Sequence, residues 1–254
     1  MISIIENNLE EYAVLCKNNP FGCRILSLYK TYSPKLPFVD YWMQKSDNNP
    51  VCLIARLESS FILCITNGCD IDELSSFLRV SGATSIICDG NYNLDLNYNS
   101  KDGVILSKRN KFLLEDNNFS IINPTSKEVY SVIKECASDN FKVPDYNSFI
   151  LDVCHKLNKK AIKILGIKEN ESLCSCIMTL AESEDSAVLG ALATLPEFRN
   201  CGYGTYLVKY LTNTLINENK TVYLHRAKNE NIEFYNNLGF VISGTWKEYS
   251  LRDE

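Results

Sequence analysis

The chain has 254 residues, a formal net charge of -5 and a sequence pI of about 5.3. Hydrophobic residues account for 45% and charged residues for 22%, which suits ordinary globular cores and excludes an intrinsically disordered chain. The acidic balance argues against a general nucleic-acid-binding protein. No apolar run approaches the ~20 residues that cross a bilayer, and the N-terminus is acidic where a secretion signal is basic. We therefore expect a cytoplasmic protein that binds neither nucleic acid nor membrane.

Cysteine and histidine usage argues against a metal site. The 11 cysteines are scattered, odd in number and without a CxxC pair, which favours free thiols in a reducing compartment. The two histidines, His155 and His225, have no neighbour at ligand spacing. His155 falls on a predicted helix, where a structural or surface role is the simpler interpretation. We expect neither a disulfide framework nor a metal cofactor.

Residues 1–112 are expected to form a small α/β domain without a catalytic constellation, because their carboxylates fall mostly on helix starts and turns. The expected elements, in chain order, are an amphipathic helix at 7–18, a strand within 21–32, a hairpin of strands 51–56 and 61–66, a helix that begins at Asp70 with Glu73 three residues on, and strands at 84–88 and 103–107. Charge density rises between residues 107 and 118. We place the boundary there, so that residues 113–254 form a second domain.

The second half predicts a meander of strands followed by strand, crossover helix and strand. Such a crossover implies that strands 187–195 and 221–225 pair in parallel. The expected elements, in chain order, are a strand at 119–123, helices at 125–137 and 145–157, strands at 160–167, 173–181 and 187–195, a helix from the glycines at 202 and 204 to 217–219, a strand at 221–225, a helix at 230–238 that ends at Gly239, and β segments at 240–246 and 247–251.

The most informative stretch is the apolar strand at 187–195 with the basic, glycine-bearing loop that follows it. The loop contains Arg199, Gly202 and Gly204 and leads directly into a helix. A buried strand that delivers such a loop to a helix N-terminus is suited to hold a phosphate, since free amides and the helix dipole converge there. The spacing fits neither the GxGxxG dinucleotide fingerprint nor the GxxxxGK[ST] Walker loop.

Two motifs resemble those of the GNAT (GCN5-related) N-acetyltransferase superfamily. The run from Thr194 to Gly204 resembles its acyl-CoA signature, [Q/R]-x-x-G-x-[G/A], with Arg199, Gly202 and Gly204 at the three defined positions. The run FYNNLGF at 234–240 resembles its FYxxxGF element. The order and the separation of the two motifs agree with the family, and the likeness covers residues 119–251.

The resemblance implies an α+β fold of the GNAT type, with a mixed, mostly antiparallel sheet, one splayed parallel strand pair and flanking helices, preceded by the smaller α/β domain. It implies acetyl-CoA as acyl-donor substrate, with the pantetheine between the splayed strands and the pyrophosphate on the loop amides. Asn229 caps the next helix or bonds the pantetheine. The implied cofactor-binding residues are Leu192, Ala193, Thr194, Arg199, Asn200, Cys201, Gly202, Tyr203, Gly204, Thr205 and Asn229.

Tyr235 matches the family tyrosine that reaches the thioester sulfur, and a phenol is suited to protonate a departing thiolate. The alternative is a tyrosine that packs on the core beside Phe234. Cys201 is a poor nucleophile candidate, because its position serves through the backbone. No general base is apparent, since residues 187–195 include no ionisable side chain and the preceding turn, with Glu182, Glu184 and Asp185, is expected to be a solvated hairpin.

The resulting interpretation is an acetyl-CoA-dependent N-acetyltransferase that moves an acetyl group directly to a primary amine, acting as a monomer or homodimer. The amine acceptor is expected between the first two helices of the second domain and the N-terminal domain. The alternative is a CoA-binding sensor or interaction module whose chemistry has lapsed, and a longer acyl group stays open. Strand, strand, helix and strand at 51–88 repeat the order found around 187–225, without the phosphate loop. We therefore interpret the first half as a degenerate GNAT-like repeat.

Overall fold

The computed structural model describes residues 1–32, 34, 36–114, 119–138 and 143–252. In this part of the chain, strands join in one 12-stranded sheet with the order β1-β2-β3-β4-β5-β12-β6-β11-β10-β9-β8-β7. The strands are β1 (Ile2–Ile4), β2 (Val39–Ser46), β3 (Asn49–Leu57), β4 (Ser60–Ile65), β5 (Ser85–Asp89), β6 (Asn99–Lys108), β7 (Ile121–Ile122), β8 (Ile164–Glu169), β9 (Ser172–Glu182), β10 (Ser186–Thr194), β11 (Thr221–Ala227) and β12 (Val241–Ser250). The helices are α1 (Ala13–Cys16), α2 (Pro20–Thr31), α3 (Ile71–Val80), α4 (Ser126–Glu135), α5 (Tyr146–Asn158), α6 (Tyr203–Asn217) and α7 (Ile232–Asn237), with short 3-10 turns at Leu9–Tyr12 and Pro196–Phe198.

The sheet consists of two similar halves, each with one parallel strand pair. In the first half β4 and β5 are parallel, and in the second half β10 and β11 are parallel. The other strand pairs in the described residues are antiparallel. The predicted mixed, mostly antiparallel sheet is therefore confirmed. The first half also has the parallel pair that its interpretation as a degenerate GNAT-like repeat requires.

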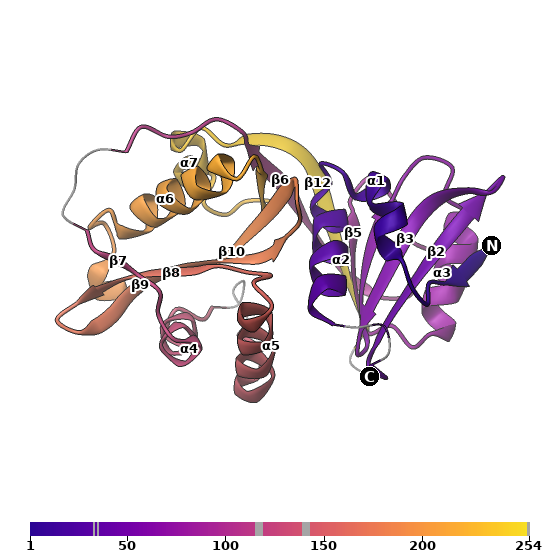
Figure 1. The fold of residues 1–254 in the computed structure, drawn as a ribbon, viewed down its shortest axis with the longest axis horizontal. Helices are drawn as coiled ribbons and strands as arrows, with labels where there is room; N and C mark the ends of the chain where they lie inside the picture. Colours follow the sequence, from indigo (N-terminus) through magenta and orange to yellow (C-terminus); the bar gives the residue numbers. More distant parts are fainter. Residues whose placement is uncertain (33, 35, 115–118, 139–142, 253–254) are drawn as a thin grey trace.

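The two halves exchange strands at the centre of the sheet. The last strand of the chain, β12, lies between β5 and β6 of the first half, and β6 in turn lies between β12 and β11 (Figure 1). Because each half contributes a strand to the other, the backbone hydrogen-bond ladder is continuous across the molecule. The domain boundary between residues 112 and 113 stays a prediction, and the sheet itself is not divided there.

The helices cover the two halves in different ways. Helix α3 packs on β4 and β5, α6 covers one face of the second half, and α4 and α5 cover its other face (Figure 1). Helix α2 lies between the halves, where its buried residues share a cluster with Tyr41 of β2 and Tyr223 of β11. The helix that joins the two units thus comes from the N-terminal part of the chain.

The strand expected within residues 21–32 is wrong, because this segment is helix α2. Asn19 caps the helix with a side-chain oxygen that accepts from the amides of Phe21 and Gly22, and Pro20 occupies the first turn. The β-forming side chains that suggested a strand are buried against both halves, so tertiary packing outweighs their intrinsic preference. Strand β2, next in the chain, was not predicted at all.

Most other elements are confirmed within a few residues of their expected bounds. Helix α4 has the reciprocal capping box in which Thr125 and Glu128 bond each other's backbone amides. Residues 241–250 form one continuous strand, β12, where two β segments were expected. All 11 cysteines are free thiols. In the described ranges, no helix combines the length and the apolar character needed to traverse a bilayer.

Candidate functional site

The parallel strands of the second half separate toward their carboxyl ends, as predicted. Strands β10 and β11 pair only from Ser186 and Thr221 to Leu189 and Leu224, while β11 continues beside β6 as far as Ala227. Beyond that point β10 bulges away. Two of its residues, 191 and 192, lie opposite the single residue 177 of β9, and residue 191 has φ 49°. A bulge of this kind bends the strand and opens a gap beside its neighbour.

A cavity of about 170 Å³ occupies this gap. It lies past the carboxyl ends of the paired segments, which is the usual place for ligands in sheets with parallel strands. Its walls are mostly apolar and come from β9, β10, β11, α6 and the segment around α7. The lining residues used below are Leu192 of the bulge, Val208 of α6, His225 of β11, and Asn231 and Tyr235 next to or on α7.

The glycine loop forms the start of α6 close to this cavity. Asn200 and Gly202 both have left-handed backbone conformations, with φ 64° and 85°, and Gly202 at the N-cap offers no side chain to the helix amides. The amides of the first turn, residues 203–205, have no intrahelical acceptor and point outward at the positive end of the helix. Gly204 lies against Leu192 and Thr194. A Cβ added at Gly204 would lie 3.4 Å from the Thr194 hydroxyl and 3.8 Å from Leu192 Cδ1.

Of the three predicted pantetheine contacts on β10, the structure brings only Leu192 into the cavity wall. Ala193 and Thr194 pair with β9, and Ser175 Oγ contacts both the Ala193 carbonyl, at 3.1 Å, and Thr194 Oγ1, at 2.8 Å. These contacts fix the end of β10 against β9. The guanidinium Nε of Arg199 donates to the Thr194 carbonyl at 3.2 Å, which ties the loop to the same strand end.

The side chains of two predicted loop residues, Tyr203 and Cys201, do not line the cavity. The Tyr203 side chain turns away to donate its hydroxyl to Glu169 Oε1 at 2.7 Å, which raises the pKa of Tyr203 to about 12. Cys201 is exposed, and its thiol lies 3.6 Å from the carbonyl of Arg199.

Tyr235 lies in the cavity wall and also packs on aromatic neighbours, and its role as the acid that protonates the thiolate stays a prediction. Its ring contacts Phe234 and Phe240 edge-on, at centroid distances of 5.0 and 5.9 Å. Burial raises the pKa of Tyr235 to about 12, which keeps the phenol protonated at neutral pH. Within the described residues its hydroxyl has no hydrogen-bond partner. The proton is therefore available to a ligand in the cavity.

Asn229 does not cap α7 as expected, because it lies exposed in the turn that precedes the helix. The N-cap is Asn231, which has φ 50° and makes no side-chain cap bond. Asn231 also lines the cavity, so it is the better placed of the two asparagines. The capping role of Asn229 is therefore wrong, and its contact with the pantetheine stays a prediction.

His225 is a cavity residue that the sequence reasoning missed. It lies between the rings of Phe21 and Trp246, at 5.4 and 6.1 Å, and its Nε2 atom is buried without a hydrogen-bond partner in the described part of the chain. Burial, with a smaller contribution from the charge of Arg24, lowers the pKa of His225 to about 3. The imidazole is therefore neutral. As a metal ligand it has no companions, since the described residues contain no group of three His, Cys, Asp or Glu side chains arranged around a common point.

The carboxylates before β10 do not form the solvated turn that was expected. Glu182 is only 5% exposed, and its Oε2 atom accepts from Lys163 at 2.6 Å and from Lys220 at 2.7 Å. Its Oε1 atom accepts from the Thr179 hydroxyl at 2.8 Å. These contacts close the end of the β9–β10 hairpin that is remote from the gap. Only Glu184 is exposed as expected, and Glu182 has a structural role.

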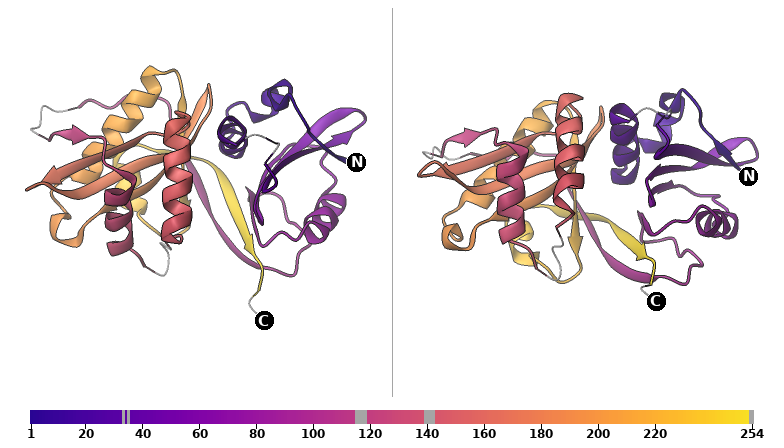
Figure 2. Two further views of the ribbon diagram at one scale, coloured as in Figure 1. Left: turned by 60° about the horizontal axis from the view of Figure 1, so that its bottom comes forward. Right: turned by 90° about the horizontal axis from the view of Figure 1, so that it is seen from below.

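A larger cavity, of about 350 Å³, lies between the two halves. Helices α2 and α5 border the space between the halves (Figure 2), and α5 is one of the two helices beside which the acceptor was expected. The charged lining residues are Arg24 of α2, Lys156 of α5 and Glu248 of β12. The α2 helix connects this cavity to the first one, because Phe21 of α2 contacts His225.

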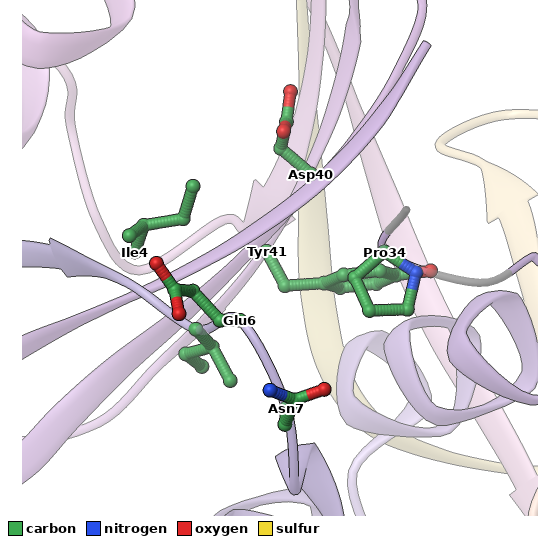
Figure 3. Close-up of a pocket in the computed structure, with 7 residues that line it drawn as sticks. Ile4, Glu6, Asn7, Pro34, Asp40 and Tyr41 are labelled. Atoms are coloured by element: carbon green, nitrogen blue, oxygen red, sulfur yellow. The ribbon is translucent and has the colours of Figure 1, made fainter. Parts of the chain in front are cut away.

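A third cavity, of about 280 Å³, lies near β1 and β2 (Figure 3). Its labelled residues include Glu6, Asn7 and Asp40, and Asp40 is paired with Arg56. It lies on the first half and shares no residue with the gap between β10 and β11. It therefore has no part in the site described above.

Comparisons with known proteins agree with this geometry. Residues 164–250 match the model of a family described as FR47-like protein, and no curated protein matches the chain. Three solved structures are similar over nearly the whole chain. They are a tandem GNAT protein from the clavulanic acid biosynthesis pathway (TM-score 0.59, 12% identity, 100% of this chain and 99% of that one), a Drosophila protein (0.62, 10%, 98% of each) and a GNAT-family acetyltransferase from Colwellia psychrerythraea (0.55, 12%, 99% and 100%). Residues 164–250 are therefore similar to the FR47-like family, and the chain has the fold of GNAT acetyltransferases in a tandem arrangement.

Proposed function

We propose that this chain, which is similar to the FR47-like family over residues 164–250 and has the GNAT fold, is an acetyl-CoA-dependent N-acetyltransferase that acts on a primary amine. One observation carries the proposal. Leu192 both lines the narrow cavity between β10 and β11 and lies against Gly204 at the start of α6. A slot for an extended thioester arm and a helix N-terminus suited to a pyrophosphate therefore meet at one residue.

In the proposed complex, acetyl-CoA extends from the glycine loop into the cavity. The amides of residues 203–205 bind the pyrophosphate, and Arg199 at the edge of the loop adds positive charge. The pantetheine follows the bulge of β10 past Leu192. The thioester then lies deep in the cavity, within reach of Tyr235.

The chain's own groups supply the chemistry of a direct transfer. The acceptor nitrogen, as a free amine, attacks the thioester carbonyl carbon, and backbone amides of the bulged strand polarise the carbonyl oxygen. The carbon–sulfur bond breaks, and the departing sulfur takes the proton of the Tyr235 hydroxyl. The nitrogen loses its surplus proton to water, and solvent returns a proton to the tyrosine. No carboxylate base is needed in this scheme, which is consistent with the locked position of Glu182.

The test is turnover with a panel of primary amines. The purified chain is incubated with acetyl-CoA and each amine, and both the release of CoA thiol and the acetylated product are measured. Transfer to at least one amine, in proportion to thiol release, is the expected result. Binding of acetyl-CoA without transfer to any amine would instead assign the alternative, a CoA-binding sensor whose chemistry has lapsed.

A further inference from the structure

We propose that the acceptor is an amine that also carries a carboxylate, of the amino-acid class, and that Arg24 and Glu248 recognise it in the cavity between the two halves. This proposal rests on the proposed function, because it names the acceptor of that reaction. It is argued from two charged side chains that face one cavity without pairing.

Arg24 is a cation without a partner. Its side chain lines the cavity of about 350 Å³, and within the described residues its guanidinium makes no hydrogen bond and no ion pair. Surrounding atoms exclude solvent from it enough to lower its pKa. The side chain is half-buried, and no carboxylate lies at salt-bridge distance from it in the described residues, so the guanidinium is free to bind an anionic group in the cavity. A guanidinium has five donors in a planar fork, which matches a carboxylate in a bidentate manner.

Glu248 supplies the opposite charge in the same cavity. It is half-buried on β12, and in the described part of the chain it has neither an ion pair nor a hydrogen bond. Its charge acts on Arg24, yet the two groups are not within the 4.0 Å of a salt bridge. A cation and an anion that face each other across a cavity fit a ligand with both charges. An amino acid has this pattern, with its carboxylate toward Arg24 and its amino group toward Glu248.

The third charged residue of the cavity does not compete for the same role. Lys156 also lines the cavity, but its ammonium already contacts Asp152 Oδ2 at 2.7 Å. Asp152 additionally accepts the Tyr32 hydroxyl at 2.8 Å. Since this group is already paired, the unpaired cation that remains is Arg24.

The position of Arg24 relates the cavity to the proposed site of transfer. Phe21 and Arg24 are three residues apart on α2 and therefore lie on one face of the helix. Phe21 contacts the ring of His225, and the charge of Arg24 reaches the same imidazole. His225 in turn lines the cavity between β10 and β11, with a buried, unpaired Nε2. An acceptor held by Arg24 therefore lies beside the wall of the thioester slot.

The cavity size suits a small acceptor. A volume of about 350 Å³ falls near the lower end of ~300–1,000 Å³ that is usual for small-molecule sites. Its walls come from α2, β3, β4, β5, α5, β9 and β12, so both halves of the chain contribute to them. The small volume favours a free amino acid over the N-terminus of a folded protein.

The test compares matched acceptors and matched variants. The twenty protein amino acids and their carboxamides are assayed with acetyl-CoA, using wild type, Arg24→Met, Glu248→Gln and, as control, Lys30→Met. Lys30 is an exposed cation on the same helix. A carboxamide lowers the pKa of its amine and so provides more free nucleophile, which means that a preference for the acid cannot arise from intrinsic reactivity. We expect at least one acid to exceed its amide by about 10- to 100-fold in kcat/KM, the range of a charge-assisted hydrogen bond.

The expected result in Arg24→Met is a raised KM for the acid, no change for the amide and loss of the preference, while Lys30→Met behaves as wild type. Glu248→Gln is expected to raise KM for the acid and the amide alike, because both carry the amino group. Equal rates for acids and amides in wild type would overturn the proposal, as would an equal loss for both acceptors in Arg24→Met.

A binding measurement separates this proposal from the proposed function. Thermal shift is recorded with the same amino acids and amides in the absence of acetyl-CoA. Arg24→Met should fold, because within the described residues it removes no hydrogen bond and no ion pair, and methionine keeps much of the aliphatic stem. If no amine is acetylated but an amino acid stabilises wild type and not Arg24→Met, the cavity assignment stands and the proposed function fails. If amines without a carboxylate are acetylated as well as amino acids, the function stands and this proposal fails.

Discussion

Replacement of Glu182 by Gln tests whether this carboxylate is a structural group or a hidden base. The substitution keeps the shape of the side chain and its bond to Thr179, but removes the charge that faces Lys163 and Lys220. If Glu182 is structural, the change should lower stability and leave the chemical step intact. If Glu182 is instead the general base, kcat should fall and the unfolding free energy should be unchanged.

The size of the effect follows from the contacts. Removal of one partner from a buried ion pair costs about 3–5 kcal/mol. Glu218 remains 3.0 Å from Lys163 and 2.8 Å from Lys220, and the Lys163 side chain is 33% exposed. We therefore expect a smaller loss, about 2–3 kcal/mol of unfolding free energy. For a chain of this size that corresponds to a fall in Tm of about 4–12 °C.

The assay is thermal unfolding together with acetyl-transfer kinetics well below the transition. Glu184→Gln is the matched control, since Glu184 is an exposed carboxylate in the same turn. The expected result is a lowered Tm with kcat unchanged for Glu182→Gln, and neither change for the control. An unchanged Tm with kcat reduced about 100-fold, as loss of a general base would produce, refutes the structural role.

Three further outcomes are expected. Gly202→Ala places a side chain at φ 85°, which should lower the unfolding free energy by about 1–2 kcal/mol and weaken acetyl-CoA binding in calorimetry. Gly82→Ala is the control, because Gly82 has φ 68° in the first half and its replacement should affect stability alone. Tyr235→Phe should reduce kcat about 100-fold without changing the KM for acetyl-CoA, while Tyr210→Phe, on the exposed side of α6, leaves both unchanged. The folded-state pKa of His225, about 3, lies below its ordinary 6.5, so the unfolded chain binds more protons between these two pH values. In this range the unfolding free energy of wild type should fall with decreasing pH by up to about 1.4 kcal/mol per pH unit, and it should fall less steeply in His225→Gln. An identical pH dependence in the two proteins would contradict a buried neutral imidazole.

The parts of the fold that were predicted correctly are those specified by local patterns. The loop with Gly202 and Gly204, the capping box of Thr125 and Glu128 and the crossover between β10 and β11 all depend on residues close together in the chain. Helix α2 was predicted wrongly because its apolar side chains pack against both halves of the sheet, so they lack the one-sided pattern of a surface helix. The strand exchange of β6 and β12 leaves no local trace, since periodicity predicts a strand but not its partner.

The candidate site was also predicted only where local patterns specify it. The loop and Tyr235 were found by their spacing, but His225, Asn231 and the cavity between the halves depend on packing across the molecule. Arg24 and Glu248 lie more than two hundred residues apart in the chain and share one cavity only because β12 crosses into the first half. No motif in one sequence connects residues so distant.

The central claim is that acetyl-CoA binds in the gap between β10 and β11 with its pyrophosphate on the start of α6. The most direct test is a crystal structure of the chain with acetyl-CoA. The account predicts pyrophosphate oxygens within hydrogen-bond distance of the amides of residues 203–205, and the thioester in the cavity beside Tyr235. Acetyl-CoA bound instead between β4 and β5 of the first half, or a thioester out of reach of the Tyr235 hydroxyl, would contradict it.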